Sequence, residues 1–374
     1  MPPKRLLYLD QIKAVVVALV IALHVPIAFS ADWLGVHIPV KGTVGPFFWG
    51  FFAWYGYAIN SFIMPMMFLI SGYFVPRSVD KKGVVCYLKG RLIRLGIPFL
   101  FGLFLINNPS YLIARLSPLS PLAELPLNKI PFNSVWVLWF LLVLFIFDLL
   151  YCGWVVLRQQ QFAVDDSASA PGMRSWVVSA FVLALIEVAM TTQMDFWAAL
   201  GRSSLNGLGA QGMHVFTYAF LFFLGCKASF HHWFERLDAH LVMKWFRLSV
   251  FLLLFCLGFS LTLSFNTNLV ENLGMIIMLR KFLHPFIAWG ILSYSMVWFR
   301  RNESRFGGWL AAAGVNSYGA YVVHSLVLVI VLMVVGFIGI NPWLIASIVT
   351  VLSTIISFGI AGQLRRIPAV ARIL

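Results

Sequence analysis

Charged residues are scarce in this chain. Asp, Glu, Lys and Arg together make up 11% of the 374 residues, roughly half the fraction that a soluble domain carries. Hydrophobic residues make up 61%, and the mean hydropathy is +0.90. This composition excludes a soluble globular protein and indicates a multi-pass membrane protein.

Cysteine is also rare. The four cysteines, Cys86, Cys152, Cys226 and Cys256, form no Cys-x-x-Cys pair. The sequence therefore predicts neither a disulfide framework nor a thiolate metal site. We expect no bound metal ion and no permanently bound cofactor.

Long polar segments are lacking too. The longest, at 158–174, is short enough to be a linker, and no internal repeat is visible, which disfavours a carrier built from inverted halves. The first apolar run is too long for a cleavable signal peptide, and no small-residue cleavage site follows it. We therefore predict a single integral membrane domain over residues 1–374.

Apolar runs that can cross about 30 Å of hydrocarbon predict an all-α polytopic bundle of about ten transmembrane helices. They lie near residues 12–30, 50–75, 92–107, 134–157, 175–194, 211–229, 246–266, 282–299, 315–337 and 342–363. An even number of spans puts both termini on one side of the membrane. That side receives 21 of the 27 Lys and Arg residues, so the positive-inside rule makes both termini cytoplasmic. The net charge of +14 thus reflects topology and not nucleic-acid binding, and we predict a bacterial inner (plasma) membrane location.

Two connecting segments stand out. The predicted outer loop 107–133 contains five prolines, which interrupt regular structure, and it is large enough to shape a binding surface. The segment 231–247 is typical of an amphipathic helix that lies on the inner membrane surface.

His24 lies deep in the first apolar span, where an ionisable side chain is costly and is usually functional. Asp10 and Lys13 precede it and project within about 40° of its direction, but they lie about 21 Å and 16 Å closer to the cytoplasm. They cannot contact His24. One helix face thus carries charged groups near the cytoplasm and an imidazole inside the membrane. This pattern is what we expect of a helix that lines a substrate tunnel. The structural alternatives are a helix-capping Asp10, a Lys13 that snorkels to the interface, and a His24 that bonds a backbone carbonyl.

Arginines gather at the cytoplasmic start of the third span. Arg91 and Arg94 are three residues apart and share a helical face, and Arg77 follows the second span. Guanidinium groups bind phosphate bidentately, so a phosphorylated ligand is one interpretation. Anionic lipid head groups are the alternative.

Polar residues also mark the ninth span. Asn316, Ser317, Tyr318, Tyr321 and His324 have spacings that allow one polar face, which could line the same tunnel. Two acids, Asp148 and Glu187, fall within the fourth and fifth spans. Each is either functional, with Glu187 as a further candidate for lining the tunnel, or a protonated packing group.

An ordered set of segments carries a resemblance to a known family. It begins with Arg5, Asp10, Lys13 and His24 and continues with FLISGYFVPR (68–77), RLIRLGIP (91–98), WFLLVL (139–144), FLFFLGCKA (220–228) and VNSYGAYVVH (315–324). This set resembles the acyltransferase 3 family of multi-spanning membrane enzymes, and is most similar to its glucan-succinylating branch. The resemblance runs over nearly the whole chain.

The resemblance implies a function. The family moves an acyl group, often acetyl or succinyl, from cytoplasmic acyl-CoA to a hydroxyl of a carbohydrate or lipid-linked acceptor. His24 would be the catalytic general base, with Asp10 and Lys13 as the acid and base of the opening motif. Arg91 and Arg94 would be the paired arginines that, with Arg77, hold the coenzyme phosphates. The implied partners are acyl-CoA as co-substrate, a glycan acceptor and the lipid bilayer.

The sequence departs from the family pattern at two positions. Lys13 replaces a more usual arginine, so a bidentate contact is not expected there. A single histidine, His324, stands where related sequences carry more, so the resemblance supports its role less strongly.

Two other classes of function remain open from the sequence. A secondary transporter or flippase of an anionic or glycosylated solute would also use buried polar residues, but it should show paired broken helices in two halves. A non-catalytic membrane sensor or assembly partner would need neither His24 nor the arginine pair.

Overall fold

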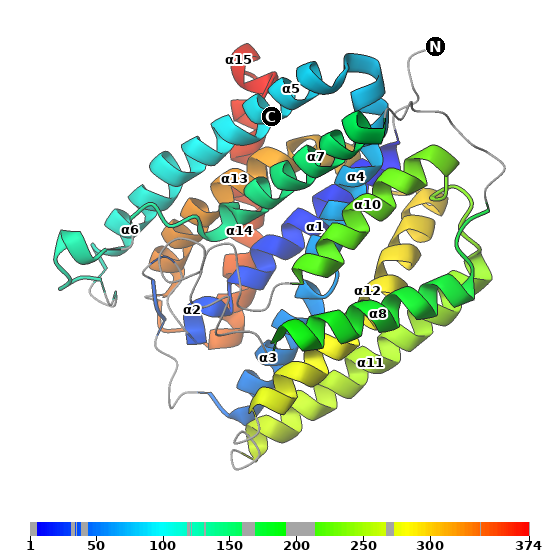
Figure 1. Cartoon of the computed structure of the whole chain (residues 1–374). Helices are drawn as coiled ribbons and strands as arrows, with labels where there is room; N and C mark the ends of the chain where they lie inside the picture. The colour runs from blue at the N-terminus through cyan, green and yellow to red at the C-terminus, as the bar shows by residue number, and fades with distance from the viewer. Residues whose placement is uncertain are drawn as a thin grey trace.

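The computed structural model describes residues 6–30, 34, 36–38, 44–117, 120, 122–130, 132–158, 169–191, 214–266, 273–336 and 338–373. Every regular element within these residues is a helix, as the sequence predicts. The elements are α1 (Leu7–His24), α2 (Ile27–Ser30), α3 (Pro46–Asn60), α4 (Ile63–Lys82), α5 (Val84–Phe101), the π-helix η1 (Gly102–Asn107), α6 (Asn108–Ala114), the short 3₁₀-helices η2 (Leu127–Lys129) and η3 (Trp136–Leu138), α7 (Trp139–Arg158), α8 (Met173–Thr191), α10 (Val215–His231), α11 (Ala239–Phe265), α12 (Leu273–Arg301), α13 (Gly307–Gly336), α14 (Pro342–Leu364) and α15 (Pro368–Ala371) (Figure 1).

Eight helical spans among the described residues are long and apolar enough to cross a membrane. They comprise α1 with α2, α3 with α4, α5 with η1 and α6, η3 with α7, and then α11, α12, α13 and α14. The fifth and sixth predicted spans coincide with the apolar helices α8 and α10, of 19 and 17 residues. The total of ten and the cytoplasmic placement of the termini stay predictions.

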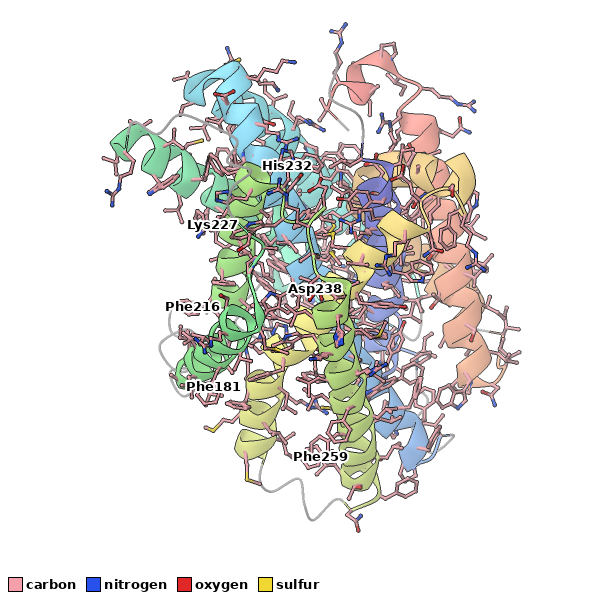
Figure 2. All side chains as sticks on the ribbon, turned by 90° about the vertical axis from the view of Figure 1, so that its right-hand side faces the viewer. Phe181, Phe216, Lys227, His232, Asp238 and Phe259 are labelled. Atoms are coloured by element: carbon pink, nitrogen blue, oxygen red, sulfur yellow. The ribbon has the colours of Figure 1, made fainter. Side chains whose placement is uncertain are left out.

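The bundle is organised around a few helix pairs (Figure 1). α1 packs against α13, and α13 packs in turn against α14. α4 packs along α10, while α11 contacts both α3 and α12, and α12 contacts α8. Figure 2 shows Phe181 of α8 and Phe216 of α10 at the outer edge of the bundle, where both are exposed. Exposed apolar side chains of this kind are expected on a lipid-facing surface.

One end of the bundle carries the start of α1 and the end of α14. Gly314 meets the backbone of Asp10 there, Gly362 lies near Asn316, and Gln11 donates to the Glu303 carbonyl at the end of α12. We call this the N-terminal end. α4 ends and α5 begins on the same side (Figure 1).

The second predicted span is broken. α3 ends at Asn60 and α4 begins at Ile63, with a two-residue interruption at Ser61 and Phe62. The buried Ser61 hydroxyl donates to the Tyr57 carbonyl at 2.7 Å, so the break leaves this polar side chain satisfied within the bundle.

The third span extends further than the sequence predicts. Helical structure continues from Val84 to Ala114, so the predicted loop 107–133 is helical in its first part. Pro109 is the second residue after the π-helix η1 and lies in the first turn of α6. The regular i to i−4 bonding is already altered there, so a residue without an N–H is tolerated.

The prediction of a separate surface helix at 231–247 is wrong. α10 ends at His231, His232 adopts a left-handed conformation with φ of 50°, and the long helix α11 begins at Ala239. The Asp238 carboxylate caps α11 by accepting from the His240 N–H at 2.9 Å. Residues 239–247 are therefore the first turns of a transmembrane helix.

Candidate active site

The core of the candidate site is the contact between α1 and α13. Gly314 allows it, because a Cβ at this position would lie 2.0 Å from the Asp10 carbonyl oxygen. Further along the same two helices, the rings of His24 and His324 lie 5.4 Å apart, centroid to centroid. The two helices therefore run parallel and bring together two histidines that are 300 residues apart in the sequence.

The hydrogen bonds of these histidines define their tautomers. His24 Nδ1 lies 2.7 Å from the Val20 carbonyl oxygen, and His324 Nδ1 lies 2.5 Å from the Tyr321 carbonyl oxygen. A carbonyl only accepts, so Nδ1 carries the proton in both rings. In a neutral imidazole Nε2 is then the basic nitrogen. The pair thus presents two groups able to accept a proton, and His324 is fully buried.

α13 presents four of its five predicted polar residues on one side. Ser317, Tyr318, Tyr321 and His324 project within about 80° of the Gly314 direction at 100° per residue. The Tyr318 hydroxyl donates to the Arg94 carbonyl at 2.6 Å, and the Tyr321 hydroxyl donates to the Val137 carbonyl. The Ser317 hydroxyl bonds the Gly314 carbonyl of its own helix at 2.7 Å.

Asn316 does not share this side. It projects about 160° away from Gly314 and lies next to α14, where a Cβ on Gly362 would be 3.4 Å from its side-chain nitrogen. The expectation of a single polar face thus fails for this residue, because a spacing of one or two positions turns a side chain across the helix.

Arg91 is part of a buried polar network. Its Nε lies 2.6 Å from Asp148 Oδ2, and the Tyr87 hydroxyl donates to Asp148 Oδ1 at 2.7 Å. Asp148 on α7 is fully buried. The network joins α5 to α7, and it gives Asp148 a partner that sequence reasoning did not identify. A buried carboxylate needs such a partner, since an unpaired buried charge is costly.

Arg94 and Arg77 have different surroundings. The Arg94 side chain is exposed, and its backbone carbonyl accepts from the Tyr318 hydroxyl. Arg77 lies 3.2 Å from a ring nitrogen of His232 and 5.7 Å from the centre of the Tyr73 ring. Figure 2 shows His232 and Lys227 near the same end of α10.

Asp10 and Lys13 lie at the N-terminal end, away from the histidines. Lys13 Nζ is 3.3 Å from Asp10 Oδ1, and it also lies 5.1 Å from the centre of the Phe74 ring. The structure therefore brings these two residues together with each other, and it does not bring them to His24.

Glu187 belongs to a second buried cluster. Its carboxylate accepts from the Thr217 N–H and hydroxyl at 3.2 and 2.9 Å, and it lies 3.4 Å from His214 and 3.8 Å from Lys281. The His214 ring stacks on His284 with centroids 3.3 Å apart.

Aromatic side chains lie between this cluster and the histidine pair. Tyr218 contacts His214 and stacks on Phe68, which contacts Phe140, and Phe140 contacts Tyr321. Sequence reasoning missed His214, Lys281 and His284. The signal was available, since all three are ionisable residues within or beside apolar spans, as His24 is.

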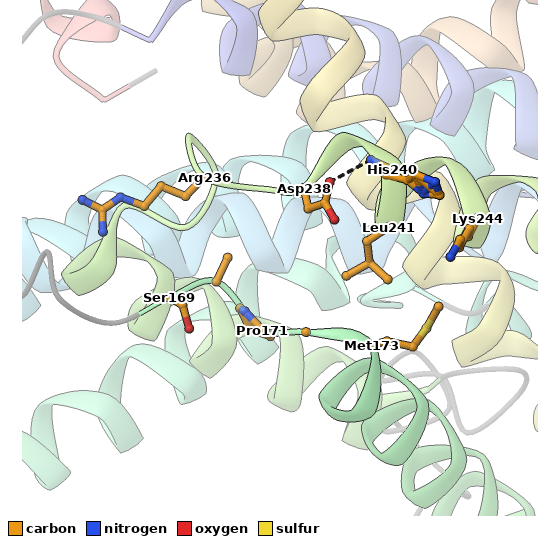
Figure 3. Close-up of a pocket in the computed structure, with 10 residues that line it drawn as sticks. Ser169, Pro171, Met173, Arg236, Asp238, His240, Leu241 and Lys244 are labelled. Atoms are coloured by element: carbon orange, nitrogen blue, oxygen red, sulfur yellow. Dashed lines mark hydrogen bonds between the residues drawn. The ribbon is translucent and has the colours of Figure 1, made fainter.

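Among the described residues, no group of three His, Cys, Asp or Glu is arranged to hold a metal ion. A surface pocket of about 530 Å³ lies between the segment Ser169–Met173 and the start of α11 (Figure 3). Its basic groups are Arg236, which precedes α11, and His240 and Lys244 of α11. None of the predicted site residues lines it.

Comparison with known proteins identifies the family. A family model described as an acyltransferase domain matches residues 6–362. The chain belongs to this family. It is an integral membrane member of it, all-helical over the residues that the structure describes, and the family supports transferase activity.

Individual relatives match over a shorter region. Glucans biosynthesis protein C of Escherichia coli O6:K15:H31 (strain 536 / UPEC) is 29% identical over 164 residues, which cover 42% of this chain and 40% of the relative. The proteins of the same name from E. coli O1:K1 / APEC and O139:H28 (strain E24377A / ETEC) are 30% identical with the same coverage. The matched region thus spans about two fifths of the length of these relatives. No solved structure matches the chain.

Proposed function

We propose that this acyltransferase moves an acyl group of the acetyl or succinyl class from cytoplasmic acyl-CoA to a hydroxyl of a glycan, with His24 as general base. The protein would act in a bacterial inner membrane. The similarity to relatives named for glucan biosynthesis supports a carbohydrate acceptor.

The observation that carries the proposal is the role of α13. This helix places Tyr318 against the arginine-bearing turn of α5 and His324 against His24. The separation of six positions corresponds to about 9 Å of helix. A donor held by its phosphates near Arg94 would thus have its thioester arm directed along α13 toward the histidine pair.

The chemistry requires one base and no covalent enzyme intermediate. The acceptor hydroxyl oxygen attacks the thioester carbonyl, a C–O bond forms, and the C–S bond breaks. His24 Nε2 accepts the hydroxyl proton as the bond forms and returns it to the thiolate of the departing coenzyme. Because His24 Nδ1 donates to the Val20 carbonyl, His24 Nε2 is the nitrogen that accepts and returns the proton.

His24→Ala and His24→Gln test the proposal. We expect either variant to lower transfer of labelled acetyl or succinyl from its CoA thioester to glucan oligosaccharides by roughly 10²- to 10⁴-fold. Glutamine can form a hydrogen bond but cannot take the proton, so it should not restore activity. Acyl-CoA affinity, measured by titration of the purified protein, should stay near that of the unmodified protein.

His240→Ala is the matched control, since His240 is exposed at the start of α11. It should retain full transfer. Substantial turnover by a well-folded His24→Gln variant would refute the role of His24 as base. Vesicles that move labelled glycan across the bilayer without acylating it would favour the transporter alternative.

A further inference from the structure

A strained segment contacts Tyr321 of α13, whose ring lies 5.7 Å from that of His324, centroid to centroid. Residues 133–138 connect the outer loop to α7 and contain two non-glycine residues in the left-handed region, Asn133 with φ of 62° and Trp136 with φ of 38°. Asparagine tolerates this conformation, whereas a tryptophan rarely adopts it. Such residues cost on the order of 1–3 kcal/mol each and persist only where the surrounding structure holds them.

Contacts from three positions hold this segment. Asn108 and Asn133 form a reciprocal pair, with the Asn133 N–H donating to Asn108 Oδ1 at 2.8 Å and Asn108 Nδ2 donating to Asn133 Oδ1 at 3.1 Å. Asn107 Nδ2 donates to the Ser134 carbonyl at 3.0 Å. The Tyr321 hydroxyl donates to the Val137 carbonyl.

The π-helix η1 supports this arrangement. Gly102, its first residue, leaves room for Leu138, since a Cβ there would lie 2.7 Å from a Leu138 methyl. From this point the buried positions recur every four residues, at Gly102, Ile106, Ser110 and Ala114. A π-turn holds more residues per turn than an α-helix and so helps to keep this spacing on one face.

Asn107 connects the strained segment to the helix that carries His324. Its side chain is fully buried, and its Oδ1 accepts from the hydroxyl of Ser325 at 3.3 Å. Ser325 directly follows His324 on α13. One amide group therefore holds the Ser134 carbonyl with its nitrogen and α13 with its oxygen.

We infer that Asn107 is a positioning residue of the transfer reaction, which fixes residues 133–138 and His324 relative to each other on the acceptor side of the site. The inference rests on the proposed function. The strained segment would form the wall against which the acceptor hydroxyl is presented to the histidine pair. Displacement of reacting groups by 1 Å can cost about 100-fold in rate, so loss of this link should affect catalysis more than donor binding.

Steady-state kinetics of Asn107→Ala and Ser325→Ala test the inference, with labelled acetyl-CoA or succinyl-CoA as donor and glucan oligosaccharides as acceptor. We expect each variant to lower kcat by at least about 10-fold with the KM for the donor unchanged. Because both residues contribute to one link, the double variant should be no slower than the slower single variant. Ser325→Thr, which retains the hydroxyl, should recover most of the activity.

Asn108→Ala is the matched control. It removes two hydrogen bonds from the same segment but none from α13, so its kcat should fall much less than that of Asn107→Ala. Equal losses in Asn107→Ala and Asn108→Ala, or independent effects of Asn107 and Ser325, would overturn the inference. Ser325→Ala loses the 3.3 Å hydrogen bond to Asn107 Oδ1 and provides a second test if Asn107→Ala fails to fold. If the proposed function itself is wrong, the unmodified protein will transfer no acyl group. That result differs from the one expected if only the inference about Asn107 is wrong.

Discussion

At the scale of single residues, Arg91 and Arg94 share a helix and a residue type but differ in their surroundings. The Arg91 guanidinium donates to the buried carboxylate of Asp148, whereas the Arg94 side chain is exposed. The contacts that each arginine already makes therefore bear on the role predicted for it. Of the two, Arg94 has the more exposed side chain.

The two arginines should respond differently to replacement by alanine. Arg91→Ala leaves the Asp148 carboxylate buried without its cation, and we expect it to destabilise the fold by about 3–5 kcal/mol. Arg94→Ala should change stability by no more than about 0.5 kcal/mol but weaken acyl-CoA affinity by about 10-fold or more, the worth of a charge-assisted hydrogen bond. Thermal unfolding in detergent and titration with acyl-CoA measure the two effects.

Lys89→Ala serves as the control for Arg94→Ala, since Lys89 is an exposed basic residue of the same helix. If both variants bind acyl-CoA with unchanged affinity, Arg94 is a lipid-anchoring charge and not a donor ligand.

At the scale of helices, the site depends on how closely α1 and α13 approach. The backbones meet at Gly314, where a side chain would collide with the Asp10 carbonyl. A backbone atom cannot move aside as a flexible side chain can, so this single glycine sets the distance between the helices that carry His24 and His324.

Gly314→Ala should therefore reduce both stability and activity. We expect a destabilisation of about 1–3 kcal/mol from overpacking and a loss of acyl transfer, because the histidines move apart. Gly308→Ala on the same helix should be harmless, since a Cβ there meets nothing within 4 Å. Thermal unfolding and the transfer assay provide the comparison, and equal behaviour of the two variants would show that the close approach is not needed.

At the scale of the whole molecule, the distribution of basic residues predicts the orientation in the membrane. Cys86 is exposed near the start of α5, at the N-terminal end, while Asn128 is exposed in the loop that follows α6. The other three cysteines are buried.

The orientation can be measured with a membrane-impermeant thiol reagent on intact cells. We expect Cys86 to label only after permeabilisation, and a Cys86→Ser, Asn128→Cys variant to label in intact cells. The opposite pattern would reverse the topology and place the arginines on the outer side.

Much of the fold was predictable because hydrophobicity is local information. The apolar runs predicted an all-α membrane protein, and each run is helical in the structure, although the second is divided between α3 and α4. Helix boundaries were less predictable. The extension of the third span to Ala114 depends on a π-turn, and the merging of 239–247 into α11 depends on where α10 ends. Both helix boundaries are decided by neighbouring elements and not by local composition.

The sequence by itself determined that His24 is an ionisable group within an apolar span, and helix geometry alone showed that Asp10 and Lys13 cannot reach it. Only the tertiary structure decided which residues meet it. The partnership of His24 with His324, of Arg91 with Asp148, and of Asn107 with Ser325 each joins helices far apart in the chain. A periodic pattern fixes the face on which a side chain lies, but the element that covers that face is chosen by packing of the whole bundle.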